Sequence, residues 1–156
     1  MTAGAIGRIL VLCEGNHCRG PLAEALLRSA LPAQARVESA GLAALEDAPA
    51  DTEAVRLARA AGLDLSAHRG RQVTPELAFG AELVLVMDEA QKAWCEALLP
   101  SVRGRVFLLG HWRPAGEREI PDPYRRGREA FHAAWQRIQL AVADWLPRLN
   151  SERRSA

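Results

Sequence analysis

Short apolar runs alternate along the chain with stretches in which apolar residues recur every three or four positions. The short runs predict four buried strands, over Arg8–Leu12, Ala35–Ser39 (stopping at Gly41), Glu82–Met87 and Arg105–Leu109. Strands that alternate with helices in this way are typical of α/β domains. We therefore expect a four-stranded parallel sheet with helices on both faces.

The helical stretches carry start and stop signals that place them between the strands. Asp51 is the expected N-cap of a helix that ends at Gly62, and Asp88 the expected cap of a helix over Glu89–Leu99. A short helix opens at Thr74-Pro75-Glu76, and a last helix covers about Arg128–Leu149. Pro21 suits the first turn of the first helix, which ends near Leu31-Pro32 and has an expected inner face of Leu22, Ala25, Leu26, Leu27, Ser29 and Ala30.

Composition narrows the classes of protein that this fold can serve. The 156 residues are 49% hydrophobic and 25% charged, which excludes a disordered chain. Twenty basic and nineteen acidic residues leave a net charge of +1, which argues against a nucleic-acid partner. The N-terminus lacks a signal peptide, and no apolar stretch approaches the roughly 20 residues that cross a bilayer. We expect a single cytoplasmic domain over 1–156 that is not inserted in a membrane.

The nine residues from Cys13 to Pro21 join the first strand to the first helix. A loop in this place directs backbone N–H groups and the positive end of a helix dipole at one point, which makes an anion site. Gly15 and Asn16 tolerate the left-handed backbone that such a loop needs, and Arg19 can bind two anion oxygens at once. All these groups favour the thiolate of Cys13, so the sequence predicts a cysteine nucleophile beneath a phosphoryl group.

A metal site in the same loop is the competing interpretation. Cys13, His17 and Cys18 are ligand types, but the loop offers no fourth ligand and the spacing matches no common zinc pattern. The N–H groups and Arg19 already supply a positive field for the anion. We therefore expect no metal and no cofactor.

A nucleophile that displaces an alcohol from phosphorus needs an acid to protonate the leaving oxygen. Asp122 is the candidate, because Pro121 and Pro123 hold its backbone extended. Tyr124, the single tyrosine of the chain, could stack on an aromatic leaving group. Without the cysteine loop, the same residues would indicate only a proline-rich surface loop.

Taken together, these features resemble the low-molecular-weight protein tyrosine phosphatases. The matching segments are Val11-Leu12-Cys13-x-Gly15-Asn16-x-Cys18-Arg19-x-Pro21, Ser39-Ala40-Gly41, His68-Arg69-x-Arg71-Gln72, Val86-Met87-Asp88 and Asp122-Pro123-Tyr124. The stretches around Ser39–Leu45 and Gly110–Arg125 look most like bacterial members that accompany tyrosine autokinases in exopolysaccharide or capsule export. The resemblance implies a phosphotyrosine-protein substrate, with phosphate or other oxyanions as inhibitors.

The resemblance also implies a role for each site residue. Cys13 attacks phosphorus to form a cysteinyl-phosphate, Arg19 holds the phosphoryl oxygens, and Asp122 is first an acid and then a base. The phosphate-binding loop contains Glu14, Gly15, Asn16, His17, Cys18 and Gly20, and the substrate pocket contains Leu45, Tyr124 and Arg125. Ser39 and His68 would hold Asn16 by hydrogen bonds, while the family assigns no role to His17. Cys18 is either a reversible disulfide partner of Cys13 or a small buried residue.

Two positions depart from the family pattern. Gly20 stands where the family usually has a Ser or Thr whose hydroxyl donates a hydrogen bond to the thiolate. The loss of this hydroxyl should raise the pKa of Cys13 and raise the free-energy barrier of the reaction by roughly 1.5–3 kcal/mol. Glu14 stands where the family has a small or apolar residue. Its carboxylate would repel a phosphate dianion unless it faces solvent or pairs with Arg125 or Arg126.

These departures keep two other functions open. Glu14 could attract the guanidinium of a phosphoarginine, which favours a protein arginine phosphatase. Gly20 favours a slow or degenerate phosphatase that binds phosphotyrosine or anions without efficient turnover. An arsenate reductase of the same fold would need two further cysteines close together, and Cys95 stands alone.

Overall fold

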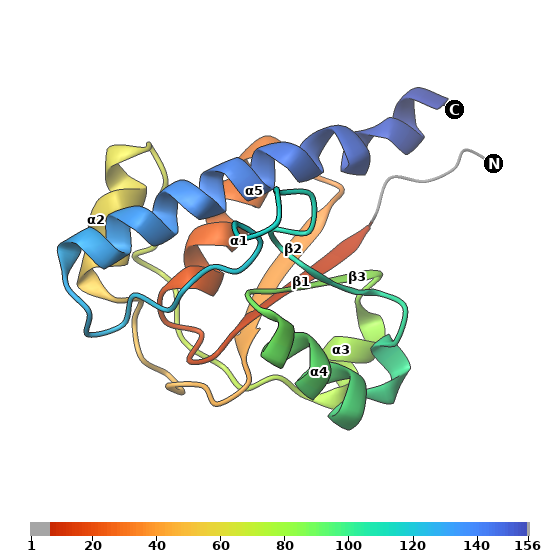
Figure 1. The fold of residues 1–156 in the computed structure, drawn as a ribbon, viewed down its shortest axis with the longest axis horizontal. Coiled ribbons are helices and arrows are strands. Elements are labelled where there is room, and N and C mark those ends of the chain that lie inside the picture. Colours follow the sequence, from red (N-terminus) through yellow and green to blue (C-terminus); the bar gives the residue numbers. More distant parts are fainter. Residues whose placement is uncertain (1–6, 156) are drawn as a thin grey trace.

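The protein, described here from a computed structural model, is a four-stranded parallel sheet covered by helices on both faces, as expected (Figure 1). The structure describes residues 7–155, with side chains as far as residue 150. The elements in chain order are β1 (Arg8–Cys13), α1 (Arg19–Ala30), β2 (Arg36–Gly41), α2 (Thr52–Ala60), α3 (Pro75–Gly80), β3 (Leu83–Val86), α4 (Glu89–Leu98), a 3-10 turn (Pro100–Val102), β4 (Val106–Leu108) and α5 (Arg128–Ser155).

The strand order β2-β1-β3-β4 places β1 inside the sheet, with β2 on one side and β3 on the other. The chain therefore reverses its direction of progress across the sheet at β1. In parallel α/β sheets, ligands bind at the carboxyl ends of the strands where this reversal occurs. Cys13 is the last residue of β1, so topology alone puts it at that position.

Side chains of β1 alternate between the two faces and so divide the core into two hydrophobic clusters. Ile9, Val11 and Cys13 belong to the cluster that packs against α1, α2 and α5. Leu10 and Leu12 belong to the cluster on the other face, together with residues of α3 and α4. This period-two pattern, buried on both sides, is the signature of a strand inside a parallel sheet.

The predicted helix caps are confirmed. The side chains of Asp51, Thr74 and Asp88 accept hydrogen bonds from backbone N–H groups in the first turns of α2, α3 and α4. Gly62, just beyond α2, has a φ of 80°, the left-handed conformation that commonly follows a helix end. Local signals were sufficient here because each cap depends only on residues two or three positions apart.

Most predicted element boundaries agree with the structure to within a few residues, and the inner face of the first helix is predicted only in part. Strand β2 (Arg36–Gly41) ends at Gly41, as expected, although it begins one residue later than predicted and its last paired residues are Ala40 and Gly41. Gly41 pairs with Cys13, and a Cβ at Gly41 would lie 2.9 Å from the carbonyl oxygen of Glu14. Helix α5 includes Pro147, as expected, because buried Trp145 and Leu149 pack against the core on both sides of it, and the helix extends beyond the predicted end at Leu149 to Ser155. Helix α1 begins at Arg19 and has Pro21 in its first turn, as expected, but Ser29 and Ala30 are exposed instead of lying on its inner face.

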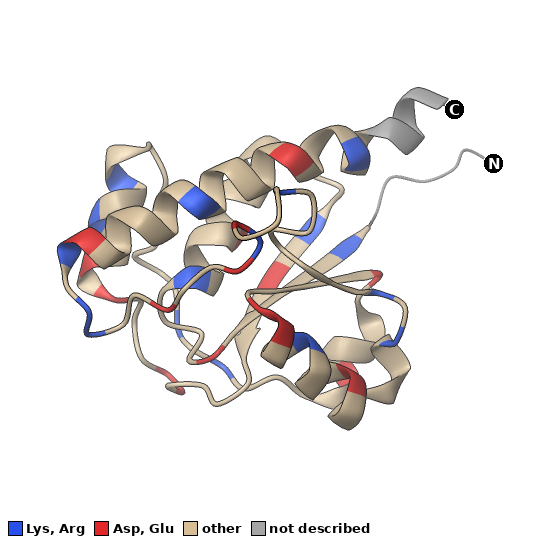
Figure 2. Cartoon of the chain, viewed as in Figure 1, with Lys and Arg blue, Asp and Glu red and all other residues tan. Residues whose placement is uncertain are grey.

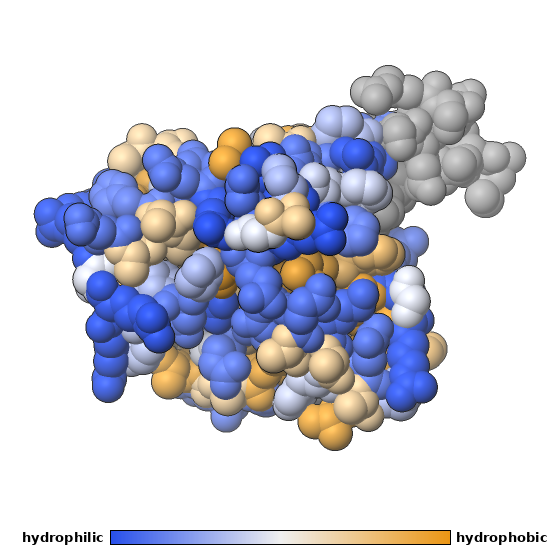
Figure 3. All heavy atoms as spheres, in the orientation of Figure 1, coloured by the Kyte–Doolittle hydropathy of each residue, from blue (hydrophilic) through white to orange (hydrophobic). Residues whose placement is uncertain are grey.

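Charge and hydropathy are spread over the molecule. Basic and acidic residues are interspersed along most elements rather than collected on one (Figure 2). The face in Figure 3 is largely hydrophilic, with apolar residues scattered between polar ones. Among the described residues, no helix has the length and apolar character needed to span a bilayer.

Candidate active site

The loop between β1 and α1 is held in shape by Asn16. Its φ of 54° is the left-handed conformation that the sequence predicts for this position. The side-chain amide donates to Ser39 Oγ at 2.9 Å and accepts from the backbone N–H of Arg71 at 2.9 Å. His68 Nε2 lies 2.8 Å from the carbonyl oxygen of Asn16. The expected contacts of Asn16 with Ser39 and His68 are therefore present, and two distant segments, around Ser39 and over residues 68–71, fix one loop residue.

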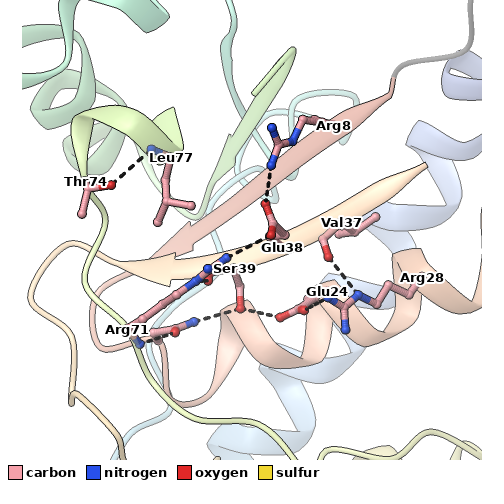
Figure 4. A network of polar contacts seen from close by, with 10 residues as sticks. Arg8, Glu24, Arg28, Val37, Glu38, Ser39, Arg71, Thr74 and Leu77 are labelled. Carbon is pink, nitrogen blue, oxygen red and sulfur yellow. Dashed lines mark hydrogen bonds and ion pairs between the residues drawn. The ribbon is translucent and has the colours of Figure 1, made fainter. Parts of the chain in front are cut away.

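A network of polar contacts continues behind Ser39 (Figure 4). The Ser39 hydroxyl donates to Glu24 of α1 at 2.5 Å, and Glu24 pairs with Arg28 at 2.8 Å. Arg71 donates to the carbonyl oxygen of Ser39 and lies 3.6 Å from Glu38. The role of Glu24 could not be predicted from the sequence. A glutamate on a helix becomes a partner of Ser39 only when the strand that carries Ser39 packs against that helix.

The thiol of Cys13 lies at the base of the loop and is buried. Gly20 N–H donates to its sulfur at 3.3 Å. Burial raises the pKa of Cys13, against the lowering effects of the Arg19 charge and of hydrogen bonds from the Gly20, Asn16 and His17 N–H groups. The sequence named the groups that favour the thiolate, but the net direction is opposite, because the desolvation that dominates depends on packing that no local pattern encodes.

Arg19 reaches across the site from the first turn of α1. Its buried guanidinium donates through Nη1 to the carbonyl oxygen of Ile120 at 2.7 Å. Its Nη2 lies 3.5 Å from a carboxylate oxygen of Asp122, whose side chain is 43% exposed. The other oxygen of Asp122 accepts from the backbone N–H of Tyr124 at 3.1 Å. The guanidinium thus joins the phosphate-binding loop to the loop that carries the candidate acid.

A cavity of about 130 Å³ lies at the centre of this arrangement. Cys13, Arg19 and Asp122 all line it, together with Glu14, Gly15, His17, Cys18, Ala43, Leu45 and Tyr124. Arg125 does not line it but stacks over the ring of Tyr124, with its guanidinium carbon 5.0 Å from the ring centre. Asn16, Gly20, Ser39 and His68 support the loop from outside the cavity.

Glu14 is exposed and stands between this cavity and a neighbouring hollow of about 440 Å³. Asp88, Gln91, Trp94 and Asp122 are among the residues that line the neighbouring hollow. Of the two arrangements that would relieve its repulsion of phosphate, the structure favours exposure: among the described residues, Glu14 forms no ion pair with Arg125 or Arg126.

Two residues of the site escaped the sequence analysis. Ala43 lines the cavity, because its segment bonds to the loop through Ala43 N–H to Glu14 carbonyl oxygen at 2.8 Å. Gly70 has to be a glycine, because a Cβ there would overlap the carbonyl oxygen of Leu45. Neither carries a motif of its own, and both are defined by contacts between distant segments.

A larger hollow of about 700 Å³ lies behind the loop and does not contain the candidate catalytic residues. It shares Ser39 and His68 with the loop support, but Cys13, Arg19 and Asp122 do not line it. The small cavity has the chemistry instead: a buried thiol, a buried guanidinium and a facing carboxylate. A strand–loop–helix unit with these groups is the arrangement of the cysteine-dependent phosphatases.

Comparison with known proteins defines the family. Residues 8–155 match the family of low molecular weight phosphotyrosine protein phosphatases, and the chain belongs to this family. It is 44% identical over 146 residues to a probable low molecular weight protein-tyrosine-phosphatase, EpsP, of Ralstonia nicotianae, covering 94% of this chain and 98% of that protein.

Solved structures show the same fold. The tyrosine phosphatase Wzb from Escherichia coli K30, in complex with sulphate, is 42% identical with a TM-score of 0.87, over 92% of this chain and 99% of that one. The YwlE arginine phosphatase from Geobacillus stearothermophilus is 28% identical with a TM-score of 0.88, over 95% and 96% of the two chains. The protein is a low-molecular-weight protein tyrosine phosphatase that also shares its fold with an arginine phosphatase.

Proposed function

We propose that this phosphatase acts through a cysteinyl-phosphate intermediate on Cys13. The supporting observation is that Cys13, Arg19 and Asp122, from two distant parts of the chain, line one cavity. The cavity is small. The guanidinium of Arg19 and the loop N–H groups, which are the two kinds of group that assist the sulfur of Cys13, lie beside it. The whole chain serves as one phosphatase domain.

In the first step, Cys13 gives up its proton to solvent and its sulfur attacks phosphorus. The S–P bond forms as the bond from phosphorus to the phenolic oxygen breaks, and Asp122 passes its proton to that oxygen. Arg19 and the loop N–H groups hold the phosphoryl oxygens and stabilise the charge that they carry in the transition state.

In the second step, water attacks phosphorus and Asp122 accepts its proton. The S–P bond breaks, orthophosphate leaves, and the released thiolate of Cys13 takes a proton from solvent to return to the starting thiol. Asn16, held by Ser39 and His68, keeps the loop N–H groups pointed at the phosphate position throughout.

The substrate that we propose is a phosphotyrosine-containing protein, a tyrosine autokinase of exopolysaccharide synthesis or export. Similarity to EpsP and Wzb supports this choice. Tyr124 and Leu45 provide an aromatic and an apolar wall for a phenyl ring. The three cysteines are free thiols, which fits a cytoplasmic location. Phosphate and other oxyanions should compete for the loop.

Cys18 has two proposed roles that remain distinct. After a peroxide oxidises the Cys13 thiol to a sulfenic acid, the Cys18 thiol could attack that sulfur, releasing water and forming a disulfide. Both thiols line the same cavity, which supports this step. In the other role, Cys18 is a small buried residue at the N-cap of α1.

The test is hydrolysis of aryl phosphates with acid-quench trapping of the intermediate. Wild type should form protein-bound phosphate, and Cys13→Ser should form none. Asp122→Asn should lose roughly 100-fold or more in kcat/KM, which reports the first step, with a larger loss for phenyl phosphate than for a nitrophenyl ester that needs little protonation. Cys95→Ala, which removes a remote buried thiol, is the matched control and should keep turnover. Equal losses for the two esters would contradict the role of Asp122.

Glu14 on the cavity wall and the similarity to an arginine phosphatase favour a second candidate. A carboxylate beside the cavity could receive the guanidinium of a phosphoarginine. Peptides that carry phosphotyrosine or phosphoarginine separate the two: we expect a higher kcat/KM for phosphotyrosine. Tight binding of either peptide without turnover by wild type would instead indicate the degenerate binding protein.

A further inference from the structure

Three potential metal ligands meet beside the catalytic loop. His17 and Cys18 come from the loop, and Asp51 stands directly before α2. One ligand atom from each, a ring nitrogen, the sulfur and a carboxylate oxygen, lies within 4.8 Å of the other two. The segments are joined by a hydrogen bond from Asp51 N–H to the carbonyl oxygen of His17 at 3.0 Å, so the cluster does not depend on side-chain rotamers alone.

The ligand atoms have bonding capacity to spare. Asp51 Oδ1 caps α2 by accepting from Glu53 N–H, while Oδ2 lies 3.5 Å from His17 Nε2. The other ring nitrogen of His17, Nδ1, is buried and has no hydrogen-bond partner among the described residues. The side chains of His17 and Asp51 are only 16% and 20% exposed, and Cys18 is buried. A buried polar group without a partner is unfavourable and is a common mark of a binding site.

We propose that His17, Cys18 and Asp51 bind one divalent transition-metal ion, with Zn²⁺ the best match. Thiolate, imidazole and carboxylate together select zinc or a similar ion over Mg²⁺ and Ca²⁺, which prefer all-oxygen sites. Three protein ligands leave a fourth tetrahedral position for water. Residues 13–21 alone lack further ligands for a metal, whereas the fold supplies Asp51 from outside that stretch.

Proton balance follows from the charges around the cluster. Cys18 must release its proton to solvent when the metal binds, and His17 binds as the neutral ring. Burial, the carboxylates of Asp51 and Asp122, and the neighbouring Cys13 raise the pKa of Cys18, while Arg19 lowers it. A cation at this point offsets the same repulsion. Metal affinity should therefore increase with pH.

The site would act on the enzyme because it shares a wall with the catalytic cavity. His17 and Cys18 line the cavity beside Cys13, and His17 also contacts the ring of Tyr124 edge-on at 5.4 Å. A bound metal would hold Cys18 as a ligand and so prevent disulfide formation with Cys13. It would also fix a cation next to the phosphate position, where it should retain the phosphate product and lower turnover.

The test uses binding first, in a Cys13→Ser background, so that the nucleophile cannot supply the thiolate. Competition with a chromophoric chelator should show one Zn²⁺ per chain, and Co²⁺ should give a thiolate-to-metal charge-transfer band with tetrahedral d–d absorption. Cys18→Ala should abolish that band. His17→Phe and Asp51→Asn should each weaken Zn²⁺ binding by about tenfold or more, equivalent to roughly 1.4 kcal/mol or above.

The variants are matched to separate binding from folding. Asp51→Asn keeps the N-cap of α2, because Asn is an equally good cap, and His17→Phe keeps a ring against Tyr124. Cys95→Ala controls for a remote thiol and should bind as tightly as its parent. Absence of the cobalt band in the Cys13→Ser parent, or affinity unchanged by both His17→Phe and Asp51→Asn, would overturn the proposal. Because binding is measured without turnover, its outcome is independent of the cysteinyl-phosphate mechanism.

Discussion

The guanidinium of Arg19 has two roles in the structure. Its bond to the carbonyl oxygen of Ile120 joins α1 to the segment before Asp122, and its contact with Asp122 sets the distance between acid and loop. The planar fork of arginine allows this, because several N–H groups point in fixed directions. A lysine would retain the charge but could not hold both partners in the same plane.

Gly20 is the residue at which this protein departs most clearly from its family's pattern. Its N–H already bonds the sulfur of Cys13, but it has no hydroxyl to add a second bond. A Cβ at Gly20 would lie 2.9 Å from that sulfur, so any side chain requires the thiol to shift slightly. The effect of a hydroxyl must therefore be separated from the effect of the Cβ.

We expect Gly20→Ser to turn over faster than wild type and roughly tenfold or more faster than Gly20→Ala. The serine hydroxyl adds a charge-assisted hydrogen bond of roughly 1.5–3 kcal/mol to the thiolate that leaves phosphorus, whereas alanine adds only the close contact. Steady-state kcat with an aryl phosphate measures both. Turnover of Gly20→Ser at or below the wild-type value would show that the missing hydroxyl does not limit this enzyme.

At the scale of elements, the catalytic loop depends on segments that are far away in the chain. Asn16 is bonded to Ser39 at the end of β2 and to Arg71 before α3, and His68 contacts its carbonyl oxygen. The hydroxyl of Ser39 in turn donates a hydrogen bond to Glu24 of α1. The packing of β2 and α1 therefore makes the loop more rigid than its glycine content alone would suggest.

Replacing Asn16 separates backbone strain from side-chain bonding. Asn16→Gly keeps access to the positive φ but loses the hydrogen bonds to Ser39 and Arg71. Asn16→Ala loses these bonds and also the easy access to the positive φ. We expect kcat/KM to fall in both variants, and urea denaturation to show Asn16→Ala less stable than Asn16→Gly by about 1–2 kcal/mol. Ser39→Ala removes one of the two groups that bond to the Asn16 side chain, and it should have a smaller effect on kcat/KM. Equal stability of the Gly and Ala variants would exclude strain at this position.

For the molecule as a whole, local signals in the sequence were enough for the sheet, the caps at Asp51 and Asp88, and the loop that starts at Cys13. Each single strand, each cap and the loop depends on residues within a few positions of one another, and the parallel arrangement of the strands follows from their alternation with helices. The contact of Arg19 with Ile120, the fit of Gly70 against Leu45, and the meeting of Asp51 with His17 depend on how distant segments pack. The direction of the Cys13 pKa could not be predicted for the same reason, since burial is a property of the fold.

Burial of all three thiols also predicts how the whole molecule responds to alkali. Burial raises the pKa of Cys95 from 9.0 to about 11, and it raises those of Cys13 and Cys18 as well. The folded protein therefore keeps thiol protons that the unfolded chain releases. Stability from this source is complete below about pH 9 and is lost as pH rises towards 11.

We expect the free energy of unfolding to fall between pH 9 and 11, by at most about 1.4 kcal/mol per pH unit for each thiol involved. Urea denaturation at a series of pH values measures the slope. Cys95→Ala isolates one contribution, because Cys95 lies in the cluster against α3 and α4, on the opposite face of the sheet from Cys13 and Cys18. The variant should start less stable at pH 7, since it leaves a small cavity, but its stability should decline less steeply above pH 9. Parallel slopes for variant and wild type would mean that Cys95 ionises equally in both states, and that the alkaline loss arises in the loop thiols alone.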